Sequence, residues 1–317
     1  MKGMKNFFRE YTVFIVCALL MVVPSITSQY VFYVFERGVQ NAFLVIGLVI
    51  LIGYSGMMTL GSAAHLAIGG YAYGIYCLLG LPPVLSAAIA VATATLLGTL
   101  LAFPAFKLSG PFLVVTTVGF GEITRILILN LQSLTGGAYG LSGYPVVSQA
   151  MQKYLYYGMV ALLLLVILAV RRLGRSRIGL ALKAVRQDQV AAEVMGVHIK
   201  RAKVAAYALS SLLAGLSGVF LANLTGYLSP DSFTGSESAT YLLMTVMGGM
   251  SNPTGAAVSS VGITALPEVL RFLYSSRLMV YSLALLIYIR VKWGRKRRVA
   301  LVKPSAQGAP KPKGGES

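Results

Sequence analysis

Two charged residues inside an apolar stretch are the first candidates for chemistry. Glu122 and Arg125 lie in the segment GPFLVVTTVGFGEITRILILN, where each alone would cost about 2.5–3.5 kcal/mol at the centre of a bilayer. Their i, i+3 spacing places both on one face of a helix, so the two side chains can pair. Two interpretations stay open: a buried structural pair, or a pair that gates or lines a solute pathway.

The sequence offers few residues or motifs that could catalyse a reaction. The patterns G-x-x-x-x-G-K-[ST], H-E-x-x-H, C-x-x-C and G-x-S-x-G are all missing. The chain has nine carboxylates and two histidines, and its two cysteines, Cys17 and Cys77, fall in apolar segments. We therefore predict no catalytic residue, no metal site and no cofactor in this chain, and we expect His65 to be a packed, neutral histidine rather than a proton relay.

The elements that must position the charged residues are long and apolar. Of the 317 residues, 56% are hydrophobic and 11% are charged, whereas a soluble domain carries about 25% charged residues. The apolar runs approach the ~20 residues that cross a bilayer, and they are continuous, unlike the strands of a β-barrel. We predict an all-α polytopic membrane protein with about ten transmembrane segments, some short or broken, at 11–27, 39–55, 57–80, 83–103, 111–131, 154–172, 203–225, 239–251, 254–270 and 277–291.

The basic residues indicate how these segments are oriented. The net charge is +18, and 22 of the 27 Lys and Arg residues lie in 1–10, 104–110, 171–203 and the tail from Arg290. Because basic residues collect on the cytoplasmic side of a membrane, we predict that both termini and the 171–203 stretch are cytoplasmic. The positive charge then needs no nucleic acid to explain it.

The stretch GYSGMMTLGSAAHLAIGG, from Gly53 onward, crowds small and polar residues between two spans. Backbone that is not helical at membrane depth is tolerated where it lines a cavity or is buried in protein. We therefore predict a broken helix here. Its candidate pathway residues, together with the charged pair, are Ser55, Gly56, Thr59, Ser62, Glu122 and Arg125.

The stretch SRIGLALKAVRQDQVAAEVMG, residues 176–196, is the most charged internal part of the chain. It predicts a helix over 177–186 with Ile178, Leu182 and Val185 on one face. A second short helix over 189–195 would be capped by Asp188 and ended by Gly196. On physical grounds alone this is either a solvated linker or a helix that docks into a partner.

Four segments together resemble the permease subunits of branched-chain amino acid ABC importers, of the LivM type. The most specific is GLALKAVRQDQVAAEVMGVHIKRAKVAAYALSSLLAGLSGVF, which is similar to the loop that contacts the ATPase subunit in that family. The others are GYSGMMTLGSAAHLAIGGYAYG, GPFLVVTTVGFGEITRILILN with LTGGAYGLSG, and YLLMTVMGGMSNPTGA, in the expected order over most of residues 50–290.

The resemblance implies residues and partners. It assigns Arg186, Asp188, Ala191, Ala192, Glu193 and Gly196 to ATPase coupling. Gln187 and Gln189 depart from the family, where acidic residues are frequent, and His65 stands where an aromatic residue is common. The implied partners are a second permease subunit, making a heterodimer, two ATP-binding subunits that hold all the ATP, and an external binding protein. That protein would dock on outer loops that include 131–153 and 225–238.

The implied organisation is a cytoplasmic N-terminus at 1–10, a transmembrane permease domain at 11–291 with a cytoplasmic coupling loop at 173–203, and a basic, disordered cytoplasmic tail at 292–317. Residues 1–28 look like a secretory signal, but we expect a retained span, because no A-x-A-like cleavage site follows cleanly. The expected location is the bacterial inner (plasma) membrane. The alternatives are an importer of urea or short amides, and an ion-coupled secondary transporter.

Overall fold

The computed structural model describes residues 29–105 and 110–269, together with positions 17, 20, 21, 281–283, 285, 286 and 290. The chain divides into two compact units, residues 1–272 and 273–317, and the description below concerns the first. The predicted spans 11–27 and 277–291, the N-terminus 1–10 and the tail 292–317 lie outside the described residues, apart from the isolated positions.

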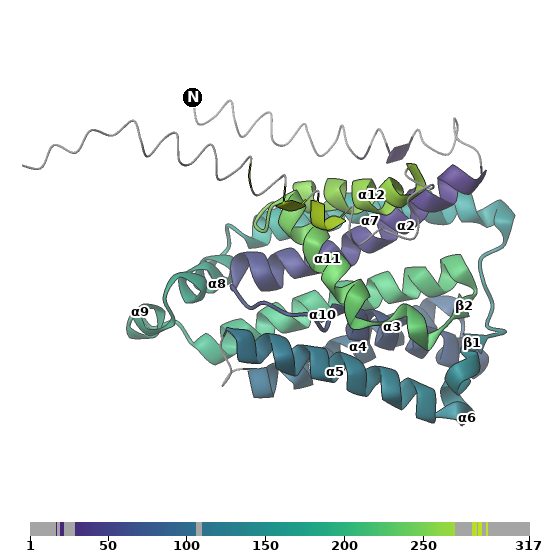
Figure 1. Cartoon of the computed structure of the whole chain (residues 1–317), viewed down its shortest axis with the longest axis horizontal. Coiled ribbons are helices and arrows are strands. Elements are labelled where there is room, and N and C mark those ends of the chain that lie inside the picture. Colours follow the sequence, from purple (N-terminus) through teal and green to yellow (C-terminus); the bar gives the residue numbers. More distant parts are fainter. Residues whose placement is uncertain are drawn as a thin grey trace, which may run out of the picture. The chain divides into compact units, whose positions relative to one another are not determined.

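The described part of the first unit is helical apart from one small sheet (Figure 1). Its long helices are α2 (Gln29–Leu48), α3 (Ser62–Leu78), α4 (Pro83–Ala105), α5 (Pro111–Asn130), α7 (Gln149–Leu173), α10 (Ile199–Thr225), α11 (Gly235–Gly248) and α12 (Pro253–Val269). Its short elements are η1 (Val49–Tyr54), α6 (Gln132–Thr135), η2 (Gly137–Tyr139), β1 (Leu141–Ser142), α8 (Arg177–Gln187), α9 (Gln189–Val194), β2 (Tyr227–Leu228) and η3 (Pro230–Ser232).

Five of the described helical segments are long and apolar enough to cross a membrane. They are Gln29–Tyr54, Pro83–Leu100, Pro111–Asn130, Met151–Leu173 and Ile199–Thr225. The prediction of an all-α, multi-pass membrane protein is thereby confirmed. The total of about ten spans and the cytoplasmic side of the termini stay predictions.

The predicted start of the second span, at residue 39, is wrong. The helix begins ten residues earlier, at Gln29, because its polar side chains find partners inside the bundle. Glu36 accepts a hydrogen bond from Gln152 Nε2 at 2.7 Å, and Gln40 donates to the Ser217 hydroxyl at 2.7 Å. The predicted span included Gln40 but left out Glu36, and in the fold both side chains are buried.

Helix α10 lies at the centre of the unit and packs against α2, α3 and α4 (Figure 1). The contact with α3 depends on small residues, among them Gly218 of α10 and Gly70 of α3. A Cβ on Gly218 would lie 2.7 Å from the backbone nitrogen of Gly70. Close backbone approach of this kind is how helices associate in lipid, where the hydrophobic effect gives no drive between them.

Two interruptions of helical structure, which we call breaks, lie close together near the end of α2. The helix continues as a π-helix, η1, and then loses helical structure until Ser62. The second break is the turn between α11 and α12, where Gly249 has a φ of +94° and Pro253 starts the next helix. The predicted segments 239–251 and 254–270 correspond to the two helices α11 and α12, joined by this turn. The broken helix predicted after Gly53 is confirmed.

Substitution of Gly53 tests how closely these two breaks approach. A Cβ there would overlap the carbonyl oxygen of Met250, and its nearest other contact would be the Met250 carbonyl carbon at 2.7 Å. We expect Gly53→Ala to lower the free energy of unfolding by about 1–3 kcal/mol, the usual cost of overpacking. Thermal unfolding of the purified protein measures this loss. The control is Gly158→Ala in α7, where a Cβ meets nothing within 4 Å, and equal stability of the two variants would contradict the close approach.

Candidate coupling site and pathway residues

The 176–196 stretch folds as a hairpin of two helices. Ser176 caps α8 by accepting from the Gly179 amide at 3.3 Å. Asp188 caps α9, because its carboxylate accepts from the amides of Val190 at 2.8 Å and Ala191 at 3.1 Å. Gly196 follows α9 with a φ of +84°, the left-handed conformation that ends helices. The predicted helices, cap and stop are confirmed.

The residues of the two helices differ in how far they are buried. On the predicted face of α8, Leu182 and Val185 are buried and Ile178 is 51% exposed. On α9, Ala191 is exposed and Ala192 is buried. Only Ala191 of these two alanines therefore belongs to the exposed surface of α9.

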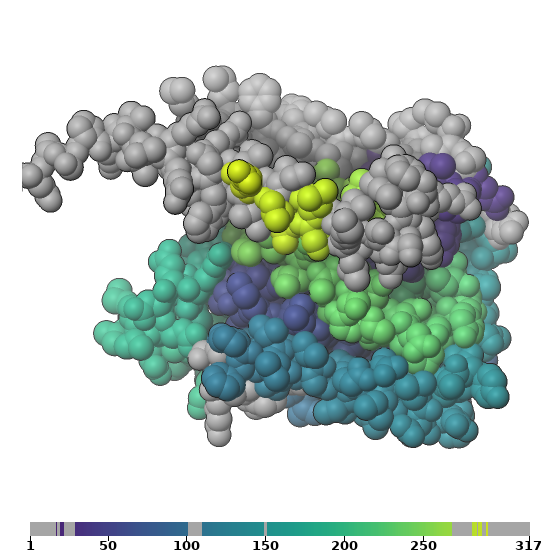
Figure 2. All heavy atoms as spheres, viewed as in Figure 1, coloured from purple at the N-terminus to yellow at the C-terminus, as the bar shows by residue number. Residues whose placement is uncertain are grey.

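Helix α9 presents apolar side chains to solvent. Val190 is 73% exposed, Val194 is 82% exposed and Met195 is 83% exposed. The acidic Glu193 is exposed beside them. Figure 2 shows the hairpin in teal, projecting from the side of the unit. A small apolar surface with one charge, held clear of the helix bundle, has the form of a docking element.

The hairpin is nevertheless anchored to its own chain. Gln189 Oε1 accepts a hydrogen bond at 3.2 Å from Lys203 Nζ, whose side chain is buried in α10. Gln189 thus serves an internal contact at a position where acidic residues are frequent in the family that the sequence resembles. Arg186 is exposed but also contacts its own chain: its Nη1 donates to the carbonyl of Gly53 and, at 3.2 Å, to the hydroxyl of Ser251.

The candidate pathway residues of the broken helix lie mostly in the interior of the unit. Ser55, Thr59 and Ser62 are buried. The Ser55 hydroxyl donates to the Leu51 carbonyl at 2.5 Å, and Thr59 Oγ1 accepts from the Gly61 amide at 3.2 Å. Gly56 is exposed and has a φ of +75°. Their place in a solute pathway stays a prediction.

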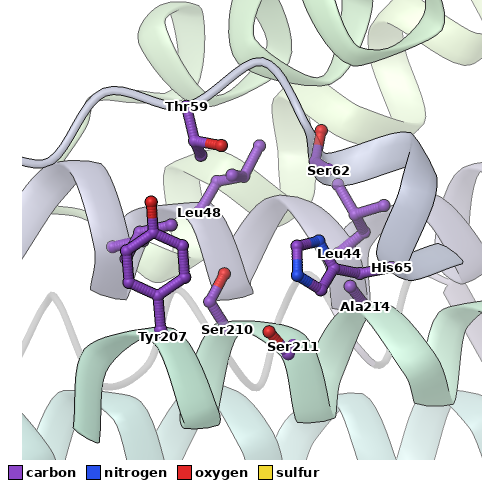
Figure 3. A pocket seen from close by; sticks show the side chains of 10 residues that line it. Leu44, Leu48, Thr59, Ser62, His65, Tyr207, Ser210, Ser211 and Ala214 are labelled. Atoms are coloured by element: carbon purple, nitrogen blue, oxygen red, sulfur yellow. The ribbon is translucent and has the colours of Figure 1, made fainter. Parts of the chain in front are cut away.

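Two of these residues line a small pocket of mixed polar and apolar side chains between α2, α3 and α10 (Figure 3). Its volume of about 10 Å³ leaves room for at most one water molecule. Figure 3 shows His65 on α3 and Tyr207 on α10 at this pocket, below Thr59. His65 is buried, and its Nδ1 lies 3.0 Å from the Gly61 carbonyl. The expected packed position of His65 is confirmed.

Glu122 and Arg125 form the predicted pair, with Arg125 Nη2 2.6 Å from Glu122 Oε1. The pair is not buried in this chain: the side chains of Glu122 and Arg125 are 49% and 26% exposed. Arg125 Nη1 also lies 3.5 Å from Asp231 on η3. α5 packs with its opposite face, through Leu113, Thr117, Thr124 and Ile128. An ion pair inside an apolar span cannot face lipid cheaply, so this face requires protein or water.

The two loops expected on the outer side lie side by side. β1 from residues 131–153 pairs antiparallel with β2 from residues 225–238. The Tyr227 hydroxyl donates to the Tyr139 carbonyl at 3.0 Å, and the Tyr144 hydroxyl to the Ala222 carbonyl at 3.1 Å. Figure 1 places this sheet at the end of the bundle opposite α8 and α9. The described residues hold no group of three or more His, Cys, Asp or Glu that could bind a metal ion.

Sequence reasoning missed three participants at the hairpin. Lys203 and Ser251 were not selected, because a lysine or a serine at these places carries no local signal. Met195 was assigned to the end of α9 but not to its exposed apolar surface. The helical spacing of Val190, Val194 and Met195 could have indicated that surface before the structure was known.

Long apolar helices interrupted by non-helical backbone are the features of a multi-pass membrane protein. The family described as branched-chain amino acid transport system / permease component matches residues 30–291. The chain belongs to this family.

Curated relatives agree with this assignment. The chain is 33% identical over 276 residues to the high-affinity branched-chain amino acid transport system permease proteins LivM of Salmonella typhimurium and of Escherichia coli. Each match covers 77% of this chain and 64% of the relative's own length. The fructose import permease protein FrcC of Rhizobium meliloti is 32% identical over 149 residues, covering 44% of this chain and 41% of FrcC. No solved structure is significantly similar to the chain.

The cap of α9 gives a direct test of the hairpin geometry. Asp188→Ala removes the acceptor of two amides, which should cost about 1 kcal/mol of local helix stability. We expect faster hydrogen–deuterium exchange in a peptide spanning 187–197. Asp188→Asn keeps the acceptor oxygen and should exchange like the wild type. Unchanged exchange in Asp188→Ala would show that the carboxylate does not hold α9.

Proposed function

We propose that this chain is the membrane-spanning permease subunit of an ATP-driven ABC importer for branched-chain, hydrophobic amino acids. An external binding protein would deliver the solute, and the assembly would lie in the bacterial inner membrane. The chain supplies no chemistry, since ATP would be bound and hydrolysed by two partner subunits. Family membership supports the transport role, and the relatives named LivM support the class of solute.

One observation carries the ATP-driven part of this proposal, namely the exposed face of α9. A six-residue helix is too short to be stable alone, yet it is capped at both ends and anchored through Gln189. It holds Val190, Ala191 and Val194 in solvent, an arrangement with no benefit to the isolated chain. Seated in a cleft of an ATPase subunit, the same residues would be covered, with Glu193 placed to meet a basic group.

The charged face of α5 supports a second permease subunit. Glu122 and Arg125 point away from the helices of this chain, and Phe112 and Val115 are strongly exposed on the same helix. A second permease against this face would shield the ion pair from lipid and leave a path between the two chains. Asp231, which approaches Arg125, lies on the loop at the β1–β2 end, where the binding protein would dock.

Two alternatives keep specific support. A different solute is favoured by the similarity to a permease named for fructose, and urea and short amides are the other solutes to test. An ion-coupled secondary transporter would need a charged relay inside the membrane. Glu36 is now a further candidate for one, because it is buried and has one carboxylate oxygen without a partner in the described structure.

Substitution of Ala191 tests the docking role of α9. We expect Ala191→Arg to leave the chain folded, because this side chain is exposed, while abolishing the stimulation of ATP hydrolysis by the solute-loaded binding protein. Gel filtration reports folding, and phosphate release from the reconstituted assembly reports stimulation. Ala191→Ser is the matched control. Normal stimulation in Ala191→Arg would refute the coupling role.

Uptake into vesicles separates the importer from the alternatives. With ATP on the side of the ATPase subunits and all ion gradients collapsed by ionophores, we expect leucine uptake to continue. Valine and isoleucine should compete with leucine, whereas urea and fructose should not. Uptake that stops with the gradient would favour the secondary transporter, and competition by urea or fructose would change the assigned solute.

A further inference from the structure

Arg186 connects the cytoplasmic hairpin to two membrane helices that are distant in sequence. Its Nη1 donates to the Gly53 carbonyl at the end of η1 and, at 3.2 Å, to the hydroxyl of Ser251. Ser251 in turn donates to the same Gly53 carbonyl at 3.2 Å. The three groups therefore close a triangle that joins α8, the end of α2 and the turn before α12.

The backbone at this junction is shaped to admit the arginine. Gly53 lies against Met250 with no space for a Cβ, which brings its carbonyl to the α11–α12 turn. Gly56 has a φ of +75°, and a Cβ there would lie 2.8 Å from Arg186 Cγ. Both glycines are thus required by the contact itself. The carbonyl at a helix end has no partner within the helix, and a cation beside it is favourable.

A second contact holds the same helix at the same place. Lys183, one turn before Arg186, has its Nζ 5.0 Å from the centroid of the Tyr54 ring, and it donates to the Gly174 carbonyl. Tyr54 is the last residue of η1, and its hydroxyl donates to the Val170 carbonyl at 3.3 Å. α8 is therefore attached to α2 through two side chains, whereas only Arg186 also reaches the α11–α12 turn.

We propose that Arg186 is a positioning residue for transport, which transmits displacement of the hairpin to the end of α2 and to the α11–α12 turn. Its guanidinium contacts the Gly53 carbonyl and the Ser251 hydroxyl of the permease itself. When α9 moves, Arg186 would displace the backbone at the end of η1 and the α11–α12 turn. Neither segment is part of a continuous helix. The inference rests on the proposed function, because it names the path by which energy from the ATPase subunits reaches the spans.

The planar guanidinium suits this task better than an ammonium would. Its several fixed N–H groups can hold a carbonyl and a hydroxyl together, whereas lysine offers a compact charge on a flexible stem. A residue that only stabilised the fold would lower uptake and ATP hydrolysis together, because fewer intact assemblies would remain. A transmitting residue would lower the number of solute molecules carried per ATP hydrolysed while hydrolysis continues.

The experiment measures that ratio in proteoliposomes holding the complete importer assembly, with leucine as solute. For Arg186→Ala we expect leucine carried per ATP to fall on the order of tenfold, the effect of one lost charge-assisted contact. ATP hydrolysis should stay within about twofold of the wild type, since the α9 surface is unchanged. Arg186→Lys should give an intermediate ratio, and Ser251→Ala a smaller loss, because the Gly53 carbonyl remains.

Arg177→Ala is the matched control. Arg177 lies at the exposed start of the same helix and makes none of these contacts, so its removal should leave the ratio unchanged. An unchanged ratio in Arg186→Ala, or uptake and hydrolysis that fall in parallel, would overturn the inference. A wild-type assembly without ATP-dependent uptake would instead overturn the proposed function, so the two failures are distinguishable.

Discussion

A carbonyl that leaves helical hydrogen bonding near a membrane needs another partner, because lipid offers none. The chain meets this constraint where α2 ends: η1 gives way to non-helical backbone between Tyr54 and Ser62. The Gly53 carbonyl accepts from Arg186 and Ser251, and the Leu51 carbonyl accepts from the Ser55 hydroxyl. The α8–α9 hairpin and the α11–α12 turn are therefore both attached to the Gly53 carbonyl, where helical structure ends. The position of the hairpin relative to the long helices depends on this contact.

One side of the hairpin packs against the helix bundle, and the other side is exposed to solvent. Leu182, Val185 and Ala192 are buried and Gln189 bonds to Lys203, so one side is fixed to the bundle. Val190 and Val194 remain in solvent on the other side. A short helix gains most of its stability from packing, and α9 packs against α8 and α10. The outer face of α9 is thereby held in place while it stays exposed.

The sequence predicted what local rules control and missed what depends on distant partners. The cap at Asp188, the stop at Gly196 and the break after Gly53 follow from residue types at particular positions, and the structure has them. The early start of α2 was missed, because Glu36 lies before the predicted span 39–55 and its hydrogen bond from Gln152 depends on a partner distant in sequence. The exposure of the Glu122–Arg125 pair was equally hidden, since helical spacing shows that two side chains can meet but not which neighbour their face lacks.

The central claim is that energy enters through the exposed face of α9, and cysteine labelling tests it most directly. Val190→Cys places a thiol at a position that is 73% exposed, while Cys17 and Cys77 are 3% and 6% exposed and give little background. The account predicts rapid maleimide labelling in the isolated chain and protection in the assembly with ATPase subunits, restored when those subunits are removed. Equal labelling of the isolated chain and of the assembly, with and without ATP, would contradict it.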